Sequence, residues 1–280
     1  MSSSDAHNLL SGRYRLGRIL GSGGMSVVYE AEDLRFARRV AVKLLKRPDS
    51  PELTERLFRE ARAAGRVNHP AIITVFEYGR DDENGLDYLV MELLEGEDLA
   101  RRLARQVRLP LTTVLTLGLE IADGLAHAHD LGVVHRDLKP ANVFLASRGR
   151  RVDEIKLLDF GLAKQLDLHT LTATGQAIGT AAYMAPEQIR GSKKVDARSD
   201  IYALGLLLWE CATGAPPDRV ETVEDLARRA MFEEEPAILE SSRETPEAFR
   251  AIVRRCLRRR ASERYPDARS VCSALLALQL

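Results

Sequence analysis

The sequence predicts an α+β protein of two lobes, in which a small antiparallel β-sheet with one helix precedes a larger, mainly helical part. Short runs rich in β-branched residues dominate the chain up to residue 94, and helical patterns dominate it from residue 95 onward. The length of 280 residues also suits two lobes, since a domain typically has about 100–200 residues. We therefore expect a flexible leader over residues 1–13, a first lobe over 14–94 and a second lobe over 95–280.

The expected strands of the first lobe are separated by glycines or charged turns, such as DDENG at residues 81–85. One segment differs, because Leu53, Leu57, Ala61 and Ala64 recur at helical spacing with charged residues between them. This pattern predicts a single amphipathic helix. The strands are expected at residues 14–20, 26–33, 38–45, 73–79 and 87–94, and the helix at residues 51–67.

The second lobe carries apolar residues at helical intervals over most of its length. We expect a ligand in the cleft between a sheet-rich lobe and a helical lobe. The helices are expected at residues 98–106, 111–131, 199–213, 222–232, 246–259 and 268–278.

The composition disfavours several classes of function. Lys plus Arg and Asp plus Glu are equal at 41 each, so no net charge favours nucleic acid or a membrane surface as the partner. Cys211, Cys256 and Cys272 have no paired spacing, which predicts reduced thiols rather than disulfides or a zinc site. The sequence shows neither a signal peptide nor an uncharged run of the roughly 18–20 residues that a membrane span needs. We expect a soluble, cytoplasmic protein without a membrane segment.

A glycine-rich stretch, Gly21-Ser22-Gly23-Gly24, joins the first two expected strands. Alone, it is equally well explained as a tight turn. A strand follows it, whereas a helix would follow in a dinucleotide-binding fold and Gly-Lys-Ser/Thr would follow in a P-loop. A loop with few side-chain atoms between antiparallel strands can instead lie over a polyphosphate and offer it backbone N–H groups.

A lysine closes the third expected strand, Val40-Ala41-Val42-Lys43. A lysine in this position is usually a solvated strand end. Near a phosphate-binding loop it would instead supply a fixed cation for the α- and β-phosphates. Glu60, on the amphipathic helix, is the candidate partner for an ion pair that holds this lysine.

The strongest signal is the sequence HRDLKPAN at residues 135–142, just after an expected helix. Asp137 could accept a hydrogen bond from an attacking hydroxyl, Lys139 could neutralise a transferring phosphoryl group, and the amide oxygen of Asn142 could bind a metal ion. His135 is interpreted as a packing residue.

Asp159, in the sequence DFG at residues 159–161, directly follows another expected strand. A structural turn would explain these three residues alone. At this distance after the preceding motif, we interpret the carboxylate as the main ligand of Mg²⁺, a hard cation that binds oxygen ligands and bridges phosphates.

Together these residues resemble the eukaryotic-type protein kinases. The resemblance rests on the glycine-rich loop, VAVK at 40–43, HRDLKPAN at 135–142, DFG at 159–161 and APE at 185–187, and it covers the chain from Tyr14 to its end. The sequences GSGGMSVVYEA, GTAAYMAPEQ and SDIYALGLLLWE are most similar to the bacterial serine/threonine protein kinases.

The resemblance implies a bilobal protein-kinase fold and transfer of the γ-phosphoryl group of ATP to serine or threonine hydroxyls of proteins. It implies that Asp137 is the catalytic base or orients the hydroxyl, that Lys139 contacts the γ-phosphate, and that Met91 is the gatekeeper before a hinge at 92–94. The implied catalytic residues are Asp137, Lys139 and Lys43. The implied nucleotide contacts are Gly21, Ser22, Gly23, Gly24, Val28, Ala41, Lys43, Glu60, Met91, Glu92, Leu94, Asn142 and Asp159. The implied ligands of Mg²⁺, or of Mn²⁺ in its place, are Asn142 and Asp159.

Other implied roles concern specificity and support. Lys139 and Thr180 follow the serine/threonine pattern, since tyrosine kinases lack this lysine. Asp200 would brace the catalytic loop, and Glu187 would pair with Arg264; both roles are structural.

Two positions depart from the family pattern. Ser26, in the glycine-rich loop, is common in the bacterial branch and leaves the expectation of ATP binding in place. Residues 215–219 read APPDR where the family usually has a segment ending in Pro-Phe, so the specificity of substrate docking is not carried over.

The activation segment that follows Asp159 holds Thr170, Thr172 and Thr174. A phosphate on this segment could pair with Arg136 and order the loop. We therefore expect autophosphorylation, at Thr172 or Thr174 before Thr170; the alternative is that these are ordinary polar loop residues.

Other functions fit only part of the pattern. A pseudokinase would be expected to lack one of Lys43, Asp137 and Asp159, and all three are present. A kinase for a small molecule, such as an aminoglycoside or choline, would not need APE or Thr180. The basic run at residues 254–260 is interpreted as a solvated helix face rather than a nucleic-acid site. We expect protein substrates, a role in intracellular signalling and, by resemblance, a homodimer for activation; the chain could be the cytoplasmic catalytic part of a longer, membrane-anchored protein.

Overall fold

The computed structural model describes residues 9–23, 26–45, 65–147, 154–160, 181–191, 195–215 and 245–278. It divides into two compact units, Met1–His69 with Ile73–Glu95, and Pro70–Ile72 with Gly96–Leu280. Most of the helix expected at 51–67, and all of that expected at 222–232, lie outside the described residues.

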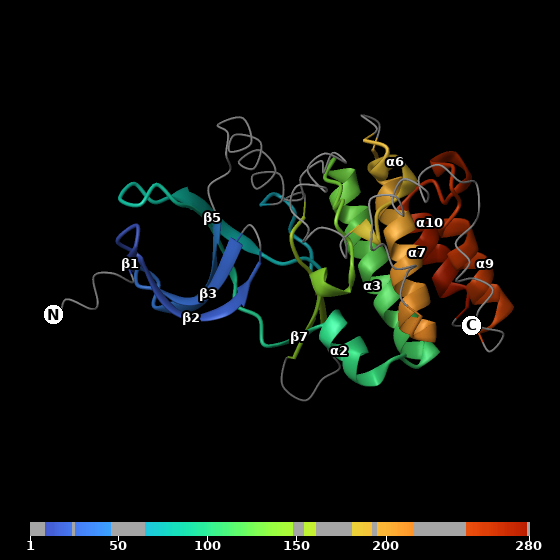
Figure 1. Cartoon of the computed structure of the whole chain (residues 1–280), viewed down its shortest axis with the longest axis horizontal. Coiled ribbons are helices and arrows are strands. Elements are labelled where there is room, and N and C mark those ends of the chain that lie inside the picture. The colour runs from blue at the N-terminus through green and yellow to red at the C-terminus, as the bar shows by residue number, and fades with distance from the viewer. Residues whose placement is uncertain are drawn as a thin grey trace. The chain divides into compact units, whose positions relative to one another are not determined.

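The first unit contains a six-stranded antiparallel sheet (Figure 1). The strands expected from the sequence are confirmed, with β5 beginning two residues later and β6 ending two residues earlier than expected. In spatial order the strands are β1 (Leu9–Leu10), β2 (Tyr14–Ser22), β3 (Ser26–Asp33), β4 (Arg38–Leu45), β6 (Asp87–Glu92) and β5 (Val75–Arg80).

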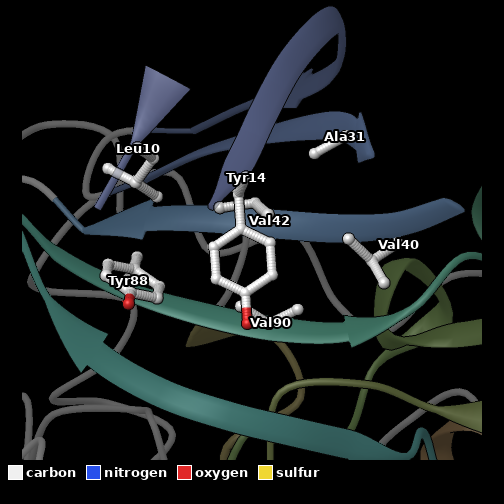
Figure 2. Packing of buried hydrophobic residues seen from close by; sticks show 7 residues of the cluster. All are labelled: Leu10, Tyr14, Ala31, Val40, Val42, Tyr88 and Val90. Atoms are coloured by element: carbon white, nitrogen blue, oxygen red, sulfur yellow. The ribbon is translucent and has the colours of Figure 1, made fainter. Parts of the chain in front are cut away.

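Strand β1 lies where the sequence predicted a flexible leader, so that prediction is wrong for residues 9–13. Leu10 pairs with Tyr14 of β2 and is 3% exposed. It packs with Tyr14, Val42 and Tyr88 on one face of the sheet (Figure 2). The turn after β1 is held as well, because the N–H and hydroxyl of Ser11 both donate to an Asp81 carboxylate oxygen, at 2.9 and 3.2 Å. Burial of two apolar faces against each other therefore orders this end of the chain.

The described helices of the second unit pack around α7 (Arg198–Thr213), whose apolar side chains point in all directions and are almost all buried. A helix that is apolar all round belongs in a core, and α3 and α9 lie against α7 (Figure 1). Helix α10 packs along α3. No helix among the described residues is long and apolar enough to cross a membrane. The other α-helices among the described residues are α2 (Leu99–Gln106), α3 (Leu111–Asp130), α6 (Pro186–Ile189), α9 (Glu247–Cys256) and α10 (Ala268–Leu276).

The second unit also holds a small three-stranded antiparallel sheet of β7 (Gly96–Asp98), β8 (Val143–Ala146) and β9 (Glu154–Leu157). Only its last strand was expected from the sequence. A short 3₁₀ helix, Pro140–Asn142, leads directly into β8, and the Leu158 N–H that follows β9 donates to the Asn142 carbonyl at 2.9 Å. This sheet therefore holds the end of HRDLKPAN next to the start of DFG.

Candidate active site

Strand pairing in the first unit brings four of the expected nucleotide contacts to one face of the sheet. Val28 of β3 lies opposite Lys43 of β4, and Ala41 of β4 lies opposite Met91 of β6. Ala41 and Lys43 are two residues apart, so their side chains point to the same face. The face that carries Leu10, Tyr14 and Tyr88 is the opposite one, because Val40 and Val42 alternate with these residues.

Lys43 is not a solvated strand end, because it is 8% exposed. A lysine is rarely buried unless its ammonium has a partner. Glu60, its expected partner, lies outside the described residues, as does Gly24. The burial of Lys43 agrees with a fixed cation on this face of the sheet.

Neither packing nor backbone conformation within the described residues requires glycine at positions 21 and 23. A Cβ atom on Gly21 would meet no described atom within 4 Å, and one on Gly23 would meet only the Ser26 carbonyl oxygen, at 3.9 Å. Neither residue has a positive φ. Where packing and backbone do not require glycine, close approach of a ligand to the main chain is a reason for it. Ser22, between them, is exposed, so this stretch is accessible to a ligand.

The expected hinge follows β6. Glu92, the last residue of that strand, is anchored twice to Thr74: its carboxylate accepts the Thr74 N–H at 2.8 Å and its own N–H donates to the Thr74 carbonyl at 3.0 Å. The Glu92 side chain is therefore used within the protein. Leu94 lies beyond the strand, in a stretch without regular structure, where backbone groups are not committed to the sheet.

In the second unit, the structure brings Asp137, Lys139 and Asn142 together. The Lys139 ammonium donates to both carboxylate oxygens of Asp137, at 2.9 and 3.1 Å. The Asn142 amide nitrogen donates to the Asp137 backbone carbonyl at 2.7 Å and to its carboxylate at 2.9 Å. The side chains of Asp137 and Lys139 remain 20% and 19% exposed. A carboxylate held in this way keeps one orientation while it still reaches solvent.

The backbone around this cluster is strained in two places. Arg136 has φ +65° and Asp159 has φ +59°, both in the left-handed region, where a residue with a side chain costs of order 1–3 kcal/mol. Arg136 precedes the expected catalytic residue Asp137, and Asp159 is itself an expected metal ligand. Such strain persists only where neighbouring groups fix the backbone.

Asp200 is one of those groups, and the expectation that it braces the catalytic loop is confirmed. Its carboxylate accepts the backbone N–H groups of His135 and Arg136, each at 2.8 Å, and contacts the His129 ring nitrogen Nε2 at 2.8 Å. Burial alone would raise the pKa of Asp200, but the His129 ring and these N–H donors outweigh it and hold the pKa below its ordinary value. Asp200 is therefore a buried carboxylate that stays charged.

His135 is a packing residue, as expected. It is fully buried, and its ring lies 4.5 Å from that of Phe160, between ring centroids. Its Nδ1 atom accepts the N–H of Asp137 at 3.3 Å. The His135 ring therefore packs HRDLKPAN against DFG, and no part in the reaction is assigned to it.

The expected pair of Glu187 and Arg264 is also confirmed, with both carboxylate oxygens bonded at 2.7 and 2.8 Å. Sequence reasoning missed three further hydrogen bonds. The Tyr183 hydroxyl donates to Glu210 of α7, and burial raises the pKa of Glu210. The Gln188 side chain bonds both the Ala185 N–H and the Arg136 carbonyl. Tyr183, Gln188 and Glu210 lie in the sequences GTAAYMAPEQ and SDIYALGLLLWE, but their spacing did not indicate which partners they bond.

Asn142 and Asp159 could supply only some of the oxygen ligands that a magnesium ion needs. Both hydrogen bonds of Asn142 to Asp137 use the amide nitrogen, which leaves the amide oxygen outside them. An amide oxygen and the Asp159 carboxylate are the hard ligands that Mg²⁺ prefers, and phosphate oxygens commonly supply the rest. Within the described ranges, no group of three or more His, Cys, Asp or Glu side chains gathers as a metal site. Thr170, Thr172, Thr174 and Thr180 lie outside these ranges.

A family model described as protein kinase domain matches residues 14–275. The chain is 35% identical over 283 residues to a probable serine/threonine-protein kinase, pknA2, of Bifidobacterium longum, covering 99% of this chain and 36% of that protein. It is 45% identical over 213 residues to the serine/threonine-protein kinase PknA of Mycobacterium tuberculosis, covering 74% of this chain and 48% of that protein. The chain thus spans less than half the length of either relative.

Among solved structures, the kinase domain of Mycobacterium tuberculosis PknI is similar to this chain. The TM-score is 0.77 and the sequence identity 29%, over 96% of this chain and 98% of that one. The sheet of the first unit and the helices of the second are therefore those of a known fold.

Proposed function

This chain is a member of the protein kinase family, of the serine/threonine type, and we propose that the residues described above transfer the γ-phosphoryl group of ATP to serine or threonine hydroxyls of protein substrates. The observation that carries this proposal is the cluster of Asp137, Lys139 and Asn142, in which an ammonium and an amide both donate to one carboxylate.

The chemistry of this cluster follows from its charges. The Asp137 carboxylate would accept a hydrogen bond from the substrate hydroxyl, orient its oxygen toward phosphorus and take its proton. Lys139, which now bonds that carboxylate, would neutralise the charge of the transferring phosphoryl group. Asn142 keeps the carboxylate in place through both of its bonds. Phosphoryl transfer depends mainly on such positioning and on neutralised charge.

We propose that Asn142 and Asp159 hold Mg²⁺, with Mn²⁺ as the alternative. When bound, such an ion neutralises phosphate charge. In the first unit, Lys43 would contact the α- and β-phosphates, and Gly21 and Gly23 would let backbone N–H groups approach them. Val28, Ala41 and Met91, on the same face, would contact the base.

A radiolabelled ATP assay tests the proposal, with Mg²⁺ and a generic basic protein as acceptor. Asp137→Asn and Lys43→Met are the matched variants, because each keeps a similar side-chain volume. Label on serine or threonine with the wild type, absent with both variants, is the expected result. Bound nucleotide without transfer by the wild type would indicate a scaffold instead.

We further propose that the kinase phosphorylates its own activation segment, at Thr172 or Thr174 in the first place and Thr170 in the second. Arg136 would pair with the phosphate, since a guanidinium matches phosphate oxygens in a bidentate manner. Intact-mass measurement after incubation with ATP should show added phosphate on the wild type and none on Asp137→Asn. An unmodified wild type would refute this.

A homodimer for activation is proposed through one surface of the first unit, made of Leu34, Phe36 and Phe76. These side chains are 39%, 61% and 41% exposed, and Arg38 lies over both rings, 5.4 Å from Phe36 and 4.0 Å from Phe76. Exposed apolar groups that gather in one place mark contact surfaces. A second copy presents the same rings and guanidinium groups, so a two-fold contact can stack them.

Sedimentation over a concentration series tests the dimer. Phe36→Ala should weaken self-association. Ile19→Ala, which removes a side chain of similar exposure, 58%, elsewhere on the same sheet, should leave it unchanged. A wild type that stays monomeric throughout would contradict the proposal.

We place this kinase in the cytoplasm, in intracellular signalling. ATP is available there, and Cys211, Cys256 and Cys272 are all free thiols, as is usual in a reducing compartment.

A further inference from the structure

Gln188, on α6, joins two backbone segments that are far apart in the sequence. Its amide oxygen accepts the Ala185 N–H at 3.0 Å, and its amide nitrogen donates to the Arg136 carbonyl at 2.9 Å. The first partner is an N–H donor and the second a carbonyl acceptor, so together they admit only one orientation of the amide. A side chain of this length that both donates and accepts is required here.

The Arg136 carbonyl belongs to the peptide bond that leads into Asp137. The preceding peptide is held by Asp200, which accepts the Arg136 N–H at 2.8 Å. Gln188 holds the following one by its carbonyl. Arg136, between the two, has φ +65°, a conformation that persists only where both sides are fixed. Gln188 therefore supplies the half of this restraint that Asp200 does not.

We propose that Gln188 is a positioning residue for Asp137: by holding the carbonyl of the Arg136–Asp137 peptide, it links the APE segment to the orientation of the catalytic carboxylate. This inference rests on the proposed kinase function. The link joins α6, which follows the activation segment in sequence, to HRDLKPAN by a single hydrogen bond. It connects Ala185, in the APE segment, to the Arg136–Asp137 peptide without using the Arg136 side chain.

The substitution that isolates this bond is Gln188→Glu. The carboxylate still accepts the Ala185 N–H, and glutamate is favoured at this third position of a helix, so the helix start should be kept. Only the donor to Arg136 is lost. Gln188→Met removes both bonds without adding charge, which separates the missing donor from electrostatic repulsion. Gln106→Glu, the same change at an exposed glutamine on α2, is the matched control.

The experiment measures kcat, KM for ATP and the thermal midpoint of the full chain with a basic protein acceptor. With both Gln188 variants we expect kcat to fall about tenfold, as the loss of one hydrogen bond that orients a reacting group would give. KM for ATP should change less than about twofold, since nucleotide contacts are untouched. The thermal midpoint of Gln188→Glu, and all values for Gln106→Glu, should stay at the wild-type level.

Three results would overturn the inference: unchanged kcat in Gln188→Glu, a loss in the Glu variant that the Met variant does not share, or a loss explained by a lowered thermal midpoint. A wild type that transfers no phosphate would instead refute the proposed function, and the positioning role with it. If the wild type transfers phosphate and both Gln188 variants have the same kcat as the wild type, only the positioning role is refuted.

Discussion

Val107, at the end of α2, carries a strained backbone at an exposed position. It has φ +57° and ψ −56°, and the Arg108 N–H donates to the Gln106 carbonyl at 2.6 Å across it. This is a γ-turn of positive φ, a rare and strained conformation, here with a β-branched residue at its centre. Glycine would relieve strain of about 1–3 kcal/mol and lose about 0.5–1 kcal/mol through unfolded-chain entropy. Val107→Gly should therefore raise the free energy of unfolding by about 1 kcal/mol, measured by urea denaturation.

The control for this substitution is Val107→Ala. Alanine removes the exposed branch but keeps the Cβ atom, so it should recover only a small part of the gain. A glycine variant that is no more stable than the alanine variant would mean that the turn is not strained in solution.

Residues that carry chemistry could be predicted from the sequence, whereas those that only hold them could not. Asp137, Lys139 and Asn142 were found because their side-chain types are rare together, and the structure joins them by hydrogen bonds. Gln188 has an ordinary neutral side chain whose importance comes from a partner 52 residues away. No local pattern encodes that distance, so only the structure reveals it.

At the scale of elements, β1 is one of the strands that the sequence missed, and its contribution can be measured. Leu10 is nearly fully buried against Tyr14 and Tyr88 (Figure 2). Leu10→Ala should lower the free energy of unfolding by about 2–4 kcal/mol, since it leaves a cavity in this small core. Leu9→Ala, at the half-buried neighbour, should cost clearly less. Equal effects would mean that β1 does not pack in solution as it does here.

The loss of unfolding free energy at low pH should depend in part on Asp33 in the first unit. Its two carboxylate oxygens accept both Nε and Nη2 of Arg13, at 2.9 and 2.8 Å, and the Arg13 guanidinium lowers the pKa of Asp33. The unfolded chain, with an ordinary pKa of about 3.9, then binds more protons than the folded chain. This contribution is therefore complete above about pH 4 and is lost as the pH falls through the lowered pKa.

Asp33→Asn should accordingly lose stability at neutral pH and show a shallower decline below about pH 4 than the wild type. Urea unfolding at a series of pH values measures both the stability at neutral pH and its decline in acid. Asp82→Asn, at an exposed carboxylate in the β5–β6 turn, should follow the wild-type curve. If the unfolding free energy of Asp33→Asn fell as steeply below about pH 4 as that of the wild type, the pH dependence would come from other carboxylates.

Element length explains which parts of the fold could be predicted. The long strands β2, β3 and β4 and the helices α3 and α7 were predicted nearly to their ends, because each covers several periods of its pattern. Strands β1, β7 and β8 have two to four residues, too few for an alternation to be recognised. Their pairing depends on distant partners, such as β8 between β7 and β9.

At the scale of the whole second unit, one buried guanidinium holds together three segments from its C-terminal half. Arg264 has no exposed side-chain surface. It lies over the Tyr202 ring at 4.9 Å, and all its donors are used. They bond both oxygens of Glu187 and the carbonyls of Arg198, Arg258 and Arg259, at 2.7–3.1 Å.

Arg264→Lys should therefore be a severe substitution despite its unchanged charge. An ammonium has three donors and no plane, so it cannot match the Glu187 carboxylate in a bidentate manner while serving the carbonyls as well. We expect a loss of about 3–5 kcal/mol in unfolding free energy, the size measured when a buried ion pair is broken. Arg269→Lys, at an exposed arginine that pairs with Asp130, is the matched control and should leave the urea midpoint unchanged. If Arg264→Lys behaved like its control, the ion pair would be incidental to this fold, and the family motif that contains Glu187 would need another explanation.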